Sequence, residues 1–404
     1  MKVLYISPQI PYPLTDGGKI SIYSSIKSLA LLGHNIDFFA YAKNTKKNEA
    51  YDELKKICNP YFLDIDTPYT ITGAIKNLFS NLPYNVEKYH RYDILPVFDK
   101  YFENNKPEIV FLNNIHMAWL YDYIKSKVPD AKIILREENF EAFIMYRFYQ
   151  NTKNLLLKIY SYIQYKRLLK YETSITEKFD SVIMISKEDE NIIKSFNSNI
   201  NTFVLPSAVD TEFERKDIIQ EKYALAHVGS LSWEPNYHSL LWFIDNVLPL
   251  LKEQYPNFKF YVYGNLANRK IPIPDDLQNN IIIKGFVEDI KSEVLSKSAL
   301  VVPLQVGSGI RIKILEFMAW ESLIITTDIG KEGIDVQHNN ELLIANTPEE
   351  FVKEISKVFD NKINFNDITQ NARNFVKNNY SFAVVSQKLQ NIISNTNIRV
   401  NNGK

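Results

Sequence analysis

The feature that most constrains the fold is a short apolar run followed by a glycine turn and an amphipathic segment. Residues 299–304 are nearly all apolar, as expected for a strand in a parallel sheet that is covered on both faces. The turn Gly307-Ser308-Gly309 follows, and from Ile310 the apolar side chains recur at helical spacing. This stretch therefore predicts a buried strand, a tight turn and a helix, the unit from which α/β domains are built.

The start of this predicted helix suits an anion. We expect residues 309–311 to form its first turn, whose backbone N–H groups lack partners within the helix and attract negative charge. Arg311 and Lys313 add two cations there, and Glu316 lies about 60° from Lys313 around a helix with roughly 3.6 residues per turn. The arrangement predicts a site for a phosphate next to hydroxyl groups. The alternative is that Arg311 and Lys313 are ordinary solvated charges.

The run Gly-Ser-Gly-Ile-Arg-Ile-Lys-Ile-Leu-Glu-Phe-Met-Ala, which starts at residue 307, closely resembles the nucleotide-sugar-binding motif of bacterial family 4 glycosyltransferases. In that family two glutamates flank the turn; the second holds the nucleotide ribose and the first touches the donor sugar. Glu316 stands at the second position, whereas Ser308 stands at the first. The resemblance assigns Ser308, Gly309, Ile310 and Glu316 to donor binding. The alternative for Glu316 is an ordinary surface salt bridge.

Length, charge and cysteine content limit the class of protein. At 404 residues the chain exceeds the usual size of one hydrophobic core, so two domains are expected. Lys plus Arg equals Asp plus Glu, at 47 each, so the sequence offers no electrostatic surface for nucleic acid. The single Cys58 excludes an intramolecular disulfide, and six scattered His offer no zinc-ligand spacing. Without a signal peptide or an apolar run near the roughly 20 residues that span a bilayer, we expect a cytoplasmic protein.

Strand-like and helical runs alternate along the chain, which is typical of parallel sheets with helices on both faces. We expect an N-terminal Rossmann-like domain at 1–208. Its predicted strands are 2–7, 35–40, 108–112, 132–135 and 181–186. Gly17 and Gly18 lie between the first strand and its helix, where a ligand can approach the backbone closely; the alternative is a plain turn. The resemblance implies that these glycines bind the donor, facing its phosphates.

Polar residues follow the strand predicted at 132–135. Family 4 sequences carry a His-Asn-x-Glu cluster at this strand end, with the His beside the reacting sugar. In this chain Glu138 stands at the His position, while Asn139 and Glu141 keep their places. The resemblance therefore assigns catalytic roles to Glu138 and Asn139. A carboxylate accepts a hydrogen bond from a sugar hydroxyl, but it donates one, as a neutral imidazole does, only when it is protonated.

The segment 142–179 is dense in Tyr, Lys and Arg and predicts one long helical stretch. Amphipathic helices with aromatic and basic residues lie against anionic membranes. Peripheral contact with the inner face of a membrane is therefore one interpretation of this segment. Ordinary packing within the N-terminal domain is the other.

A second Rossmann-like domain is expected at 222–380. Its predicted strands are the run that starts at Tyr223, then 259–264, 281–285, 299–304 and 323–327. Gly285 and Phe286 stand where, in the family, a turn approaches the nucleotide base. A C-terminal helix at 381–396 is expected to pack back on the N-terminal domain.

The start of this second domain departs from the family pattern at two positions. Many relatives place an Arg directly after the glycine and a Lys five residues later, where both neutralise the donor diphosphate. Here Gly229 is followed by Ser230, and Pro235 occupies the Lys position. We therefore expect Arg311 and Lys313 to supply the missing charge.

The resemblance covers nearly the whole chain and implies a GT-B architecture, in which two Rossmann-like, doubly wound α/β domains face each other across a cleft. The implied activity is retaining transfer of a hexose from a UDP- or GDP-sugar to a saccharide or lipid-linked saccharide, in synthesis of bacterial cell-surface polysaccharide or glycolipid. The nucleotide sugar is a substrate. Neither a cofactor nor a metal is expected, because preorganised donors and cations can stabilise the leaving phosphate. The alternative is a metal-dependent glycosyltransferase of the other fold, whose metal-binding motif the triplet Asp64-Ile65-Asp66 resembles.

A second hypothesis belongs to a different class of function. Ser230, Pro235, Ser308 and Glu138 all depart from the family pattern. A catalytically inactive relative that binds a nucleotide sugar, or that acts as a scaffold for an active partner, would show such departures.

Overall fold

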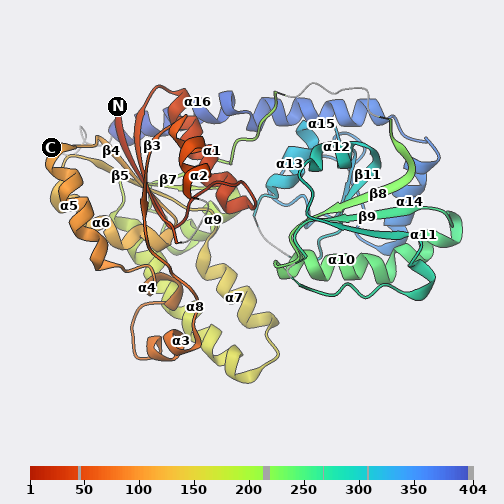
Figure 1. The fold of residues 1–404 in the computed structure, drawn as a ribbon. Coiled ribbons are helices and arrows are strands. Elements are labelled where there is room, and N and C mark those ends of the chain that lie inside the picture. Colours follow the sequence, from red (N-terminus) through yellow and green to blue (C-terminus); the bar gives the residue numbers. More distant parts are fainter. Residues whose placement is uncertain (44–46, 213–218, 267, 307–308, 399–404) are drawn as a thin grey trace. The chain divides into compact units, whose positions relative to one another are not determined.

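The computed structural model describes residues 1–43, 47–212, 219–266, 268–306 and 309–398. The chain forms two compact units (Figure 1). One consists of Met1–Ala208 and the segment from Phe382 onward, and the other of Val209–Ser381. Each unit is built on one all-parallel sheet, so the predicted α/β fold with two doubly wound domains is confirmed.

The N-terminal unit holds a seven-stranded sheet with the order β3-β2-β1-β4-β5-β6-β7. Its strands are β1 Lys2–Ser7, β2 Asn35–Tyr41, β3 Asn59–Leu63, β4 Ile109–Asn113, β5 Lys132–Arg136, β6 Ser181–Met184 and β7 Thr202–Val204. The two edge strands β3 and β7 escape the sequence prediction, because β7 is only three residues long and β3 contains Pro60, which a sheet tolerates at its edge. The order reverses between β1 and β4, the point at which such sheets bind ligands.

Helices cover both faces of this sheet (Figure 1). They are α1 Gly17–Leu31, α2 Lys47–Lys55, α3 Ile71–Asn77, α4 Tyr84–Glu87, α5 Leu95–Asn104, α6 Tyr121–Lys127, α7 Glu141–Asn151, α8 Leu155–Ile175, α9 Lys187–Phe196 and α16 Phe382–Ile398, with 3-10 turns η1 Tyr92–Ile94, η2 Ile115–Leu120 and η3 Thr176–Lys178. On one face Ile22 of α1 and Leu389 of α16 share a core with the sheet. On the other face Phe98 of α5 and Ile124 of α6 do so.

The segment predicted as one helix at 142–179 is instead a helical hairpin. Helix α7 ends at Asn151 and α8 begins at Leu155. Asn154 caps α8, since its side-chain oxygen accepts a hydrogen bond from the Leu157 N–H at 3.1 Å. The predicted helical stretch is therefore divided into two helices, because the backbone at Thr152 and Asn154 is extended and Asn154 caps the second helix.

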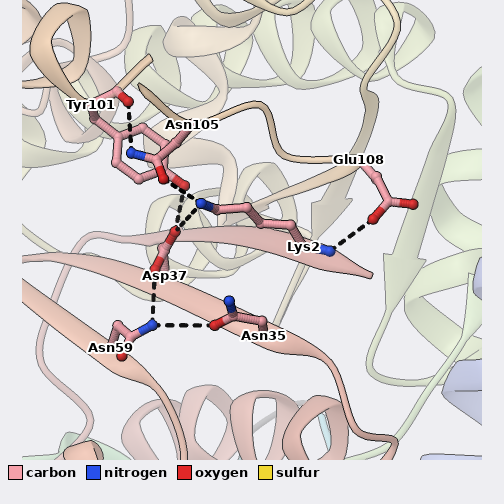
Figure 2. Close-up of polar contacts among 7 residues, drawn as sticks. All are labelled: Lys2, Asn35, Asp37, Asn59, Tyr101, Asn105 and Glu108. Atoms are coloured by element: carbon pink, nitrogen blue, oxygen red, sulfur yellow. Dashed lines mark hydrogen bonds and ion pairs between the residues drawn. The ribbon is translucent and has the colours of Figure 1, made fainter. Parts of the chain in front are cut away.

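A polar network ties the amino-terminal ends of the strands in this unit (Figure 2). Asp37 is buried and accepts hydrogen bonds from the Tyr101 hydroxyl at 2.7 Å and from the Asn59 amide at 3.1 Å. The Lys2 ammonium lies 3.5 Å from the same carboxylate, and the Lys2 N–H donates to Glu108 at 2.9 Å. Because these residues come from different elements, the network holds β1, β2, β3 and α5 together.

The C-terminal unit has a six-stranded sheet with the order β10-β9-β8-β11-β12-β13. Its strands are β8 Glu221–Val228, β9 Lys259–Tyr263, β10 Ile281–Gly285, β11 Lys297–Val302, β12 Ile324–Thr326 and β13 Leu343–Ile344. This order reverses between β8 and β11, so the ends of these two strands are where a doubly wound sheet binds its ligand. The two-residue β13 carries too short a pattern to be predicted.

The helices of this unit are α10 Glu234–Asn246, α11 Leu248–Gln254, α12 Ile290–Leu295, α13 Ile312–Ala319, α14 Pro348–Phe359 and α15 Phe365–Tyr380, with the 3-10 turn η4 Asp275–Leu277. The predicted first helical turn at 309–311 is wrong, because α13 begins at Ile312. Gly309 has φ +76°, which a right-handed helix excludes. Within the part of the chain that the structure describes, no helix is both long and apolar enough to cross a bilayer.

Candidate functional site

Three strand ends of the N-terminal sheet bring Gly18, Asn113 and Glu138 together. Asn113 ends β4, Glu138 follows β5, and Gly18 lies in the first turn of α1 after β1. The Asn113 amide donates to Glu138 Oε1 at 3.2 Å, and the Tyr5 hydroxyl donates to Asn113 Oδ1 at 2.6 Å. A Cβ atom on Gly18 would lie 3.0 Å from Glu138 Oε2. The Glu138 carboxyl group is therefore held where the strand order reverses.

The surroundings of Glu138 change its protonation. Burial raises the pKa of the Glu138 carboxyl group to about 7, even though the hydrogen bond from Asn113 and the charge of Arg136 act to lower it. At neutral pH a large fraction of this group is then protonated. The group can therefore donate a hydrogen bond as well as accept one, as the imidazole in family 4 sequences does.

The residues predicted around Glu138 differ in what they contact. Gly17 starts α1, which is capped by Asp16 through the Lys19 N–H at 3.0 Å. Asn139 is half-buried. No hydrogen-bond partner of its side chain is found among the described residues. Burial raises the pKa of Glu141 to about 7, against a hydrogen bond from Asn114.

Two buried carboxyl groups beside this cluster are absent from the sequence prediction. Glu137 is fully buried and accepts a hydrogen bond from the Ile115 N–H at 3.0 Å. Glu172 on α8 is also fully buried and accepts from the N–H groups of Glu141 and Ala142 at 3.0 and 2.9 Å. Burial raises the pKa of both carboxyl groups well above the ordinary value. Glu137 holds the backbone at Ile115 and Glu172 holds it at the start of α7. No local sequence pattern indicates partners so far apart.

In the C-terminal unit, Lys313 reaches the turn that joins β8 to α10. Its ammonium donates to the Val228 carbonyl at 3.0 Å and to Asn236 Oδ1 at 3.2 Å. The Asn236 amide in turn donates to the Ser230 carbonyl at 3.0 Å. Burial lowers the pKa of Lys313 to about 7, and the charge of Arg311 contributes. Lys313 thus lies at the turn in which Ser230 replaces the arginine of the family pattern.

Arg311 lies near the same β8–α10 turn, next to Trp233, the N-cap residue of α10. Arg311 is only 7% exposed. Its guanidinium group donates to the Gly309 carbonyl at 2.7 Å, and the guanidinium carbon lies 5.6 Å from the centre of the Trp233 ring. Arg311 and Lys313 are therefore not solvated surface charges, and that alternative is wrong. Trp233 and Asn236 were not singled out by the sequence analysis, although an amide in the first turn after a glycine loop is a usable signal.

Glycine turns line the neighbouring strand ends of the C-terminal sheet. Gly264, which follows β9, has φ +125°, and a Cβ atom there would lie 2.3 Å from the Gly229 carbonyl oxygen. Only glycine permits this close approach. The Gly264 N–H donates to the Gly285 carbonyl at 2.8 Å, and the next residue, Phe286, is 74% exposed. The predicted positions Gly229, Gly285 and Phe286 therefore lie on adjacent turns.

Glu316 on α13 is half-buried. Burial is the cause that raises the pKa of its carboxyl group to about 7. No hydrogen-bond or ion-pair partner of this carboxyl group is found among the described residues, so the surface salt-bridge alternative does not hold there. Gly309 and Ile310 are half-buried, whereas the predicted Ser308 lies outside the described residues.

The Asp64-Ile65-Asp66 triplet follows β3 in the N-terminal unit. Asp66 forms an ion pair with Lys43 at 2.7 Å. In the described ranges, no three or more His, Cys, Asp or Glu side chains are grouped so that they could hold a metal ion.

Two units of this topology define the GT-B class of glycosyltransferase folds, and solved structures agree. Sucrose-phosphate synthase from Thermosynechococcus elongatus superimposes with a TM-score of 0.69 at 14% identity, over 98% of both chains. HepE from Anabaena in complex with UDP-glucose does so with a TM-score of 0.66 at 13% identity, over 98% of this chain and 100% of that one.

Residues 222–361 match the family described as Glycosyl transferases group 1. The match covers most of the C-terminal unit, which is therefore similar to this group of glycosyltransferases. A sequence relative, an uncharacterized 44.6 kDa protein in the cps region of Klebsiella pneumoniae, is 24% identical over 392 residues, which cover 94% of this chain and 96% of the relative.

Proposed function

We propose that this chain is a retaining, metal-independent hexosyltransferase of the family 4 type that uses a UDP- or GDP-sugar. The acceptor is a saccharide or a lipid-linked saccharide in bacterial cell-surface polysaccharide or glycolipid synthesis. The observation that carries the proposal is the placement of Lys313 at the β8–α10 turn, 3.0 Å from the Val228 carbonyl. The UDP-glucose bound to HepE and the cps region of the Klebsiella relative support the choice of donor and pathway class.

The C-terminal unit is proposed to bind the nucleoside diphosphate. Departure of the leaving group puts negative charge on the phosphate, and preorganised cations stabilise that charge. Lys313 contacts the Val228 carbonyl and Asn236, and the Arg311 guanidinium lies 5.6 Å from the centre of the Trp233 ring. Both are therefore proposed to replace the two cations that the family pattern places at this turn. Glu316 is proposed to accept hydrogen bonds from the ribose, because it lies on the same helix as Lys313 and its carboxyl group has no partner among the described residues.

The N-terminal unit is proposed to act on the sugar and the acceptor. Glu138 would donate a hydrogen bond to a sugar hydroxyl in its protonated form, which its raised pKa of about 7 makes available. Gly17 and Gly18 would leave room for the donor, and Asn139 would bind a hydroxyl group. Transfer to the acceptor releases the nucleoside diphosphate, which keeps the charge that the C-terminal unit binds.

The inactive-relative hypothesis makes a different prediction. Such a protein would bind a nucleotide sugar but would not turn it over. Hydrolysis of the donor, screened across a panel of UDP- and GDP-sugars, separates the two functions. Measurable hydrolysis of one donor supports the enzyme, whereas tight binding without any turnover supports the inactive relative.

The same assay tests the residues. Lys313→Met and Arg311→Met should each lower kcat/KM by about 10²-fold or more, the range for loss of one group that stabilises the leaving charge. Lys284→Met removes an exposed cation from the same unit and should leave turnover unchanged. A thermal melt of each variant shows whether the protein still folds with normal stability. Near-normal rates in both folded variants would contradict the proposed role.

A further inference from the structure

An exposed apolar surface lies on the N-terminal unit, away from the groups described so far. It consists of the most exposed aliphatic and aromatic residues of α3, of the segment after it, and of the first turns of α8: Ile71 (82% exposed), Phe79 (93%), Leu155 (70%) and Leu156 (78%), with Ile75, Leu157 and Ile159 between them. Large apolar side chains gathered in this way on a water-soluble unit mark an interaction site. We call these seven residues the α3–α8 surface.

The parts of this surface belong together. The Gln164 amide on α8 donates to Asn77 Oδ1 on α3 at 2.7 Å, and Arg167 donates to the Asn77 carbonyl at 2.7 Å. A cavity of about 250 Å³ is lined by residues of α3, α7 and α8, among them Ile71 and Tyr160. Figure 1 shows α3 and the joined ends of α7 and α8 on the same side of the N-terminal sheet.

The segments that carry this surface are rich in cations, although Glu87 lies beside them and accepts a hydrogen bond from the Asn77 amide at 2.5 Å. Residues 68–86 contain Lys76 and neither Asp nor Glu. Residues 142–171 contain Arg147, Lys153, Lys158, Lys166, Arg167 and Lys170, and again neither Asp nor Glu. No ion-pair partner is found among the described residues for Lys76, Lys153 or Lys166, and all three are exposed. The whole chain is neutral, so this concentration of cations is local.

Tyrosines of α7 and α8 pack beside the cations of α8. Tyr149 and Tyr162 pack with ring centres 5.2 Å apart, the Lys158 ammonium lies 5.4 Å from the Tyr149 ring centre, and the Lys166 ammonium lies 5.7 Å from that of Tyr162. Exposed aliphatic side chains with tyrosines and lysines beside them match the chemistry of a bilayer, in which acyl chains meet a charged headgroup region. A second copy of the chain would instead bring like charges together.

We propose that the α3–α8 surface docks on an anionic phospholipid bilayer. The aliphatic residues of α3 and of the first turns of α8 enter the acyl region, and the lysines bind lipid phosphates. Helix α7 starts beyond the carboxyl end of β5, next to Glu138, so docking holds the part of the unit that carries Glu138 close to the lipid headgroups. The proposal is independent of the proposed function, because docking needs neither donor nor acceptor.

The experiment is co-sedimentation of the full chain with vesicles. Vesicles of phosphatidylcholine with about one third phosphatidylglycerol should bind the protein, and vesicles of phosphatidylcholine alone should bind it at least tenfold more weakly, because each cation near an anionic surface adds to the attraction. Raising the salt to about 1 M, where charges are screened within roughly 3 Å, should also weaken binding. Equal binding to both vesicles, or none to either, would overturn the proposal.

Variants locate the contact. Leu155→Ser with Leu156→Ser should lower partitioning to the anionic vesicles roughly tenfold or more, whereas Leu31→Ser at the exposed end of α1 should leave it unchanged. Lys153→Gln with Lys166→Gln should lower it to a similar degree, and the matched pair Lys100→Gln with Lys377→Gln should not. Control variants that lose as much binding as the test variants would contradict the location. A concentration-dependent dimer in size-exclusion chromatography that Leu155→Ser with Leu156→Ser abolishes would show self-association and overturn the choice of a bilayer.

Discussion

Gly18 lies directly against the carboxyl group of Glu138, since a Cβ atom on Gly18 would lie 3.0 Å from Glu138 Oε2. The two residues are 120 positions apart in sequence and come together because β1 and β5 lie on either side of β4 in the sheet. The glycine therefore does more than form a turn. It leaves the carboxyl group of Glu138 in the position from which Asn113 donates to it.

Gly18→Ala should separate activity from stability. The position is in the first turn of α1, where alanine favours the helix by about 0.5–1 kcal/mol over glycine, and its nearest contact is the movable end of a side chain. We expect an unchanged or higher melting temperature and a fall in donor turnover of roughly tenfold, because Glu138 is displaced. Leu31→Ala at the other end of α1 is the control. Unchanged turnover in folded Gly18→Ala would show that Glu138 needs no fixed position.

Substitution of Glu138 tests whether its proton matters. Because the folded pKa is about 7, the protonated donor form is present below pH 7 and is lost as the pH rises through 7. Turnover of the wild type should therefore fall above about pH 7. Glu138→Gln keeps a donor that does not titrate, so it should retain activity and lose the part of the alkaline decline that Glu138 causes; the part that comes from deprotonation of Lys313, whose pKa is also about 7, should remain.

Two further variants complete this test. Glu138→His restores the residue of the family pattern and should also retain turnover, whereas Glu138→Ala should lower it by about 10²-fold. Steady-state rates of the four proteins across the pH range are the measurement. An alkaline decline that persists unchanged in Glu138→Gln would assign it to another group.

The network around Asp37 is predicted to contribute to stability and not to activity. Asp37→Ala removes the acceptor for Tyr101 and Asn59 and the partner of Lys2 (Figure 2). Leaving these groups unpaired should lower the free energy of unfolding by about 3 kcal/mol. Chemical denaturation measures this loss. Asp52→Ala, at an exposed position in the same unit, is the control, and an equal effect of the two variants would contradict the assigned role.

Metal dependence is tested by chelation. The proposed function assigns charge stabilisation to Lys313 and Arg311, so EDTA should leave the rate of donor turnover unchanged. The measurement is the rate before chelation, after it, and after adding back Mg²⁺ or Mn²⁺. Activity that is lost with EDTA and restored by metal would contradict this assignment and favour the alternative in which Asp64 and Asp66 bind a metal ion.

The strand-turn-helix units were predictable because their apolar runs are strong local signals. Strands β1 and β10 begin and end at the predicted residues. Helix boundaries were harder to predict, because they depend on local backbone conformation. Gly309 has a positive φ and α13 begins only at Ile312, while Asn154 starts a new helix within a stretch of uniform helical composition. These helix starts are set by single residues, and the spacing of apolar side chains along the sequence does not show them.

The candidate site was predictable as a set of positions but not as a set of contacts. The resemblance pointed to Lys313 as a replacement cation, yet its partner Asn236 lies 77 residues away, and no pattern links the two. The raised pKa of Glu138 likewise results from burial by several elements. The buried Glu137 and Glu172 had no signal, because a sequence shows a carboxyl group but not its burial.

The central claim is that Glu316 and Lys313 bind the nucleoside diphosphate, and its most direct test is the affinity for UDP or GDP as a function of pH. The pKa of each group is about 7 in the free protein. Glu316 accepts hydrogen bonds from the ribose hydroxyls most strongly when it is ionised, so affinity weakens as the pH falls below 7. Lys313 must be protonated to bind phosphate, so affinity is also lost as the pH rises above 7. Nearby His227, whose pKa burial lowers to about 3, stays neutral throughout, and Arg311 stays charged.

Calorimetry from about pH 5 to about pH 9, a range set by the ordinary pKa values of these side chains, should give a bell-shaped affinity with its maximum near pH 7. Glu316→Gln should weaken the acid limb and Lys313→Met should remove the alkaline limb, each with a loss of affinity of roughly tenfold at the maximum. An affinity that both substitutions leave unchanged at every pH would contradict the account.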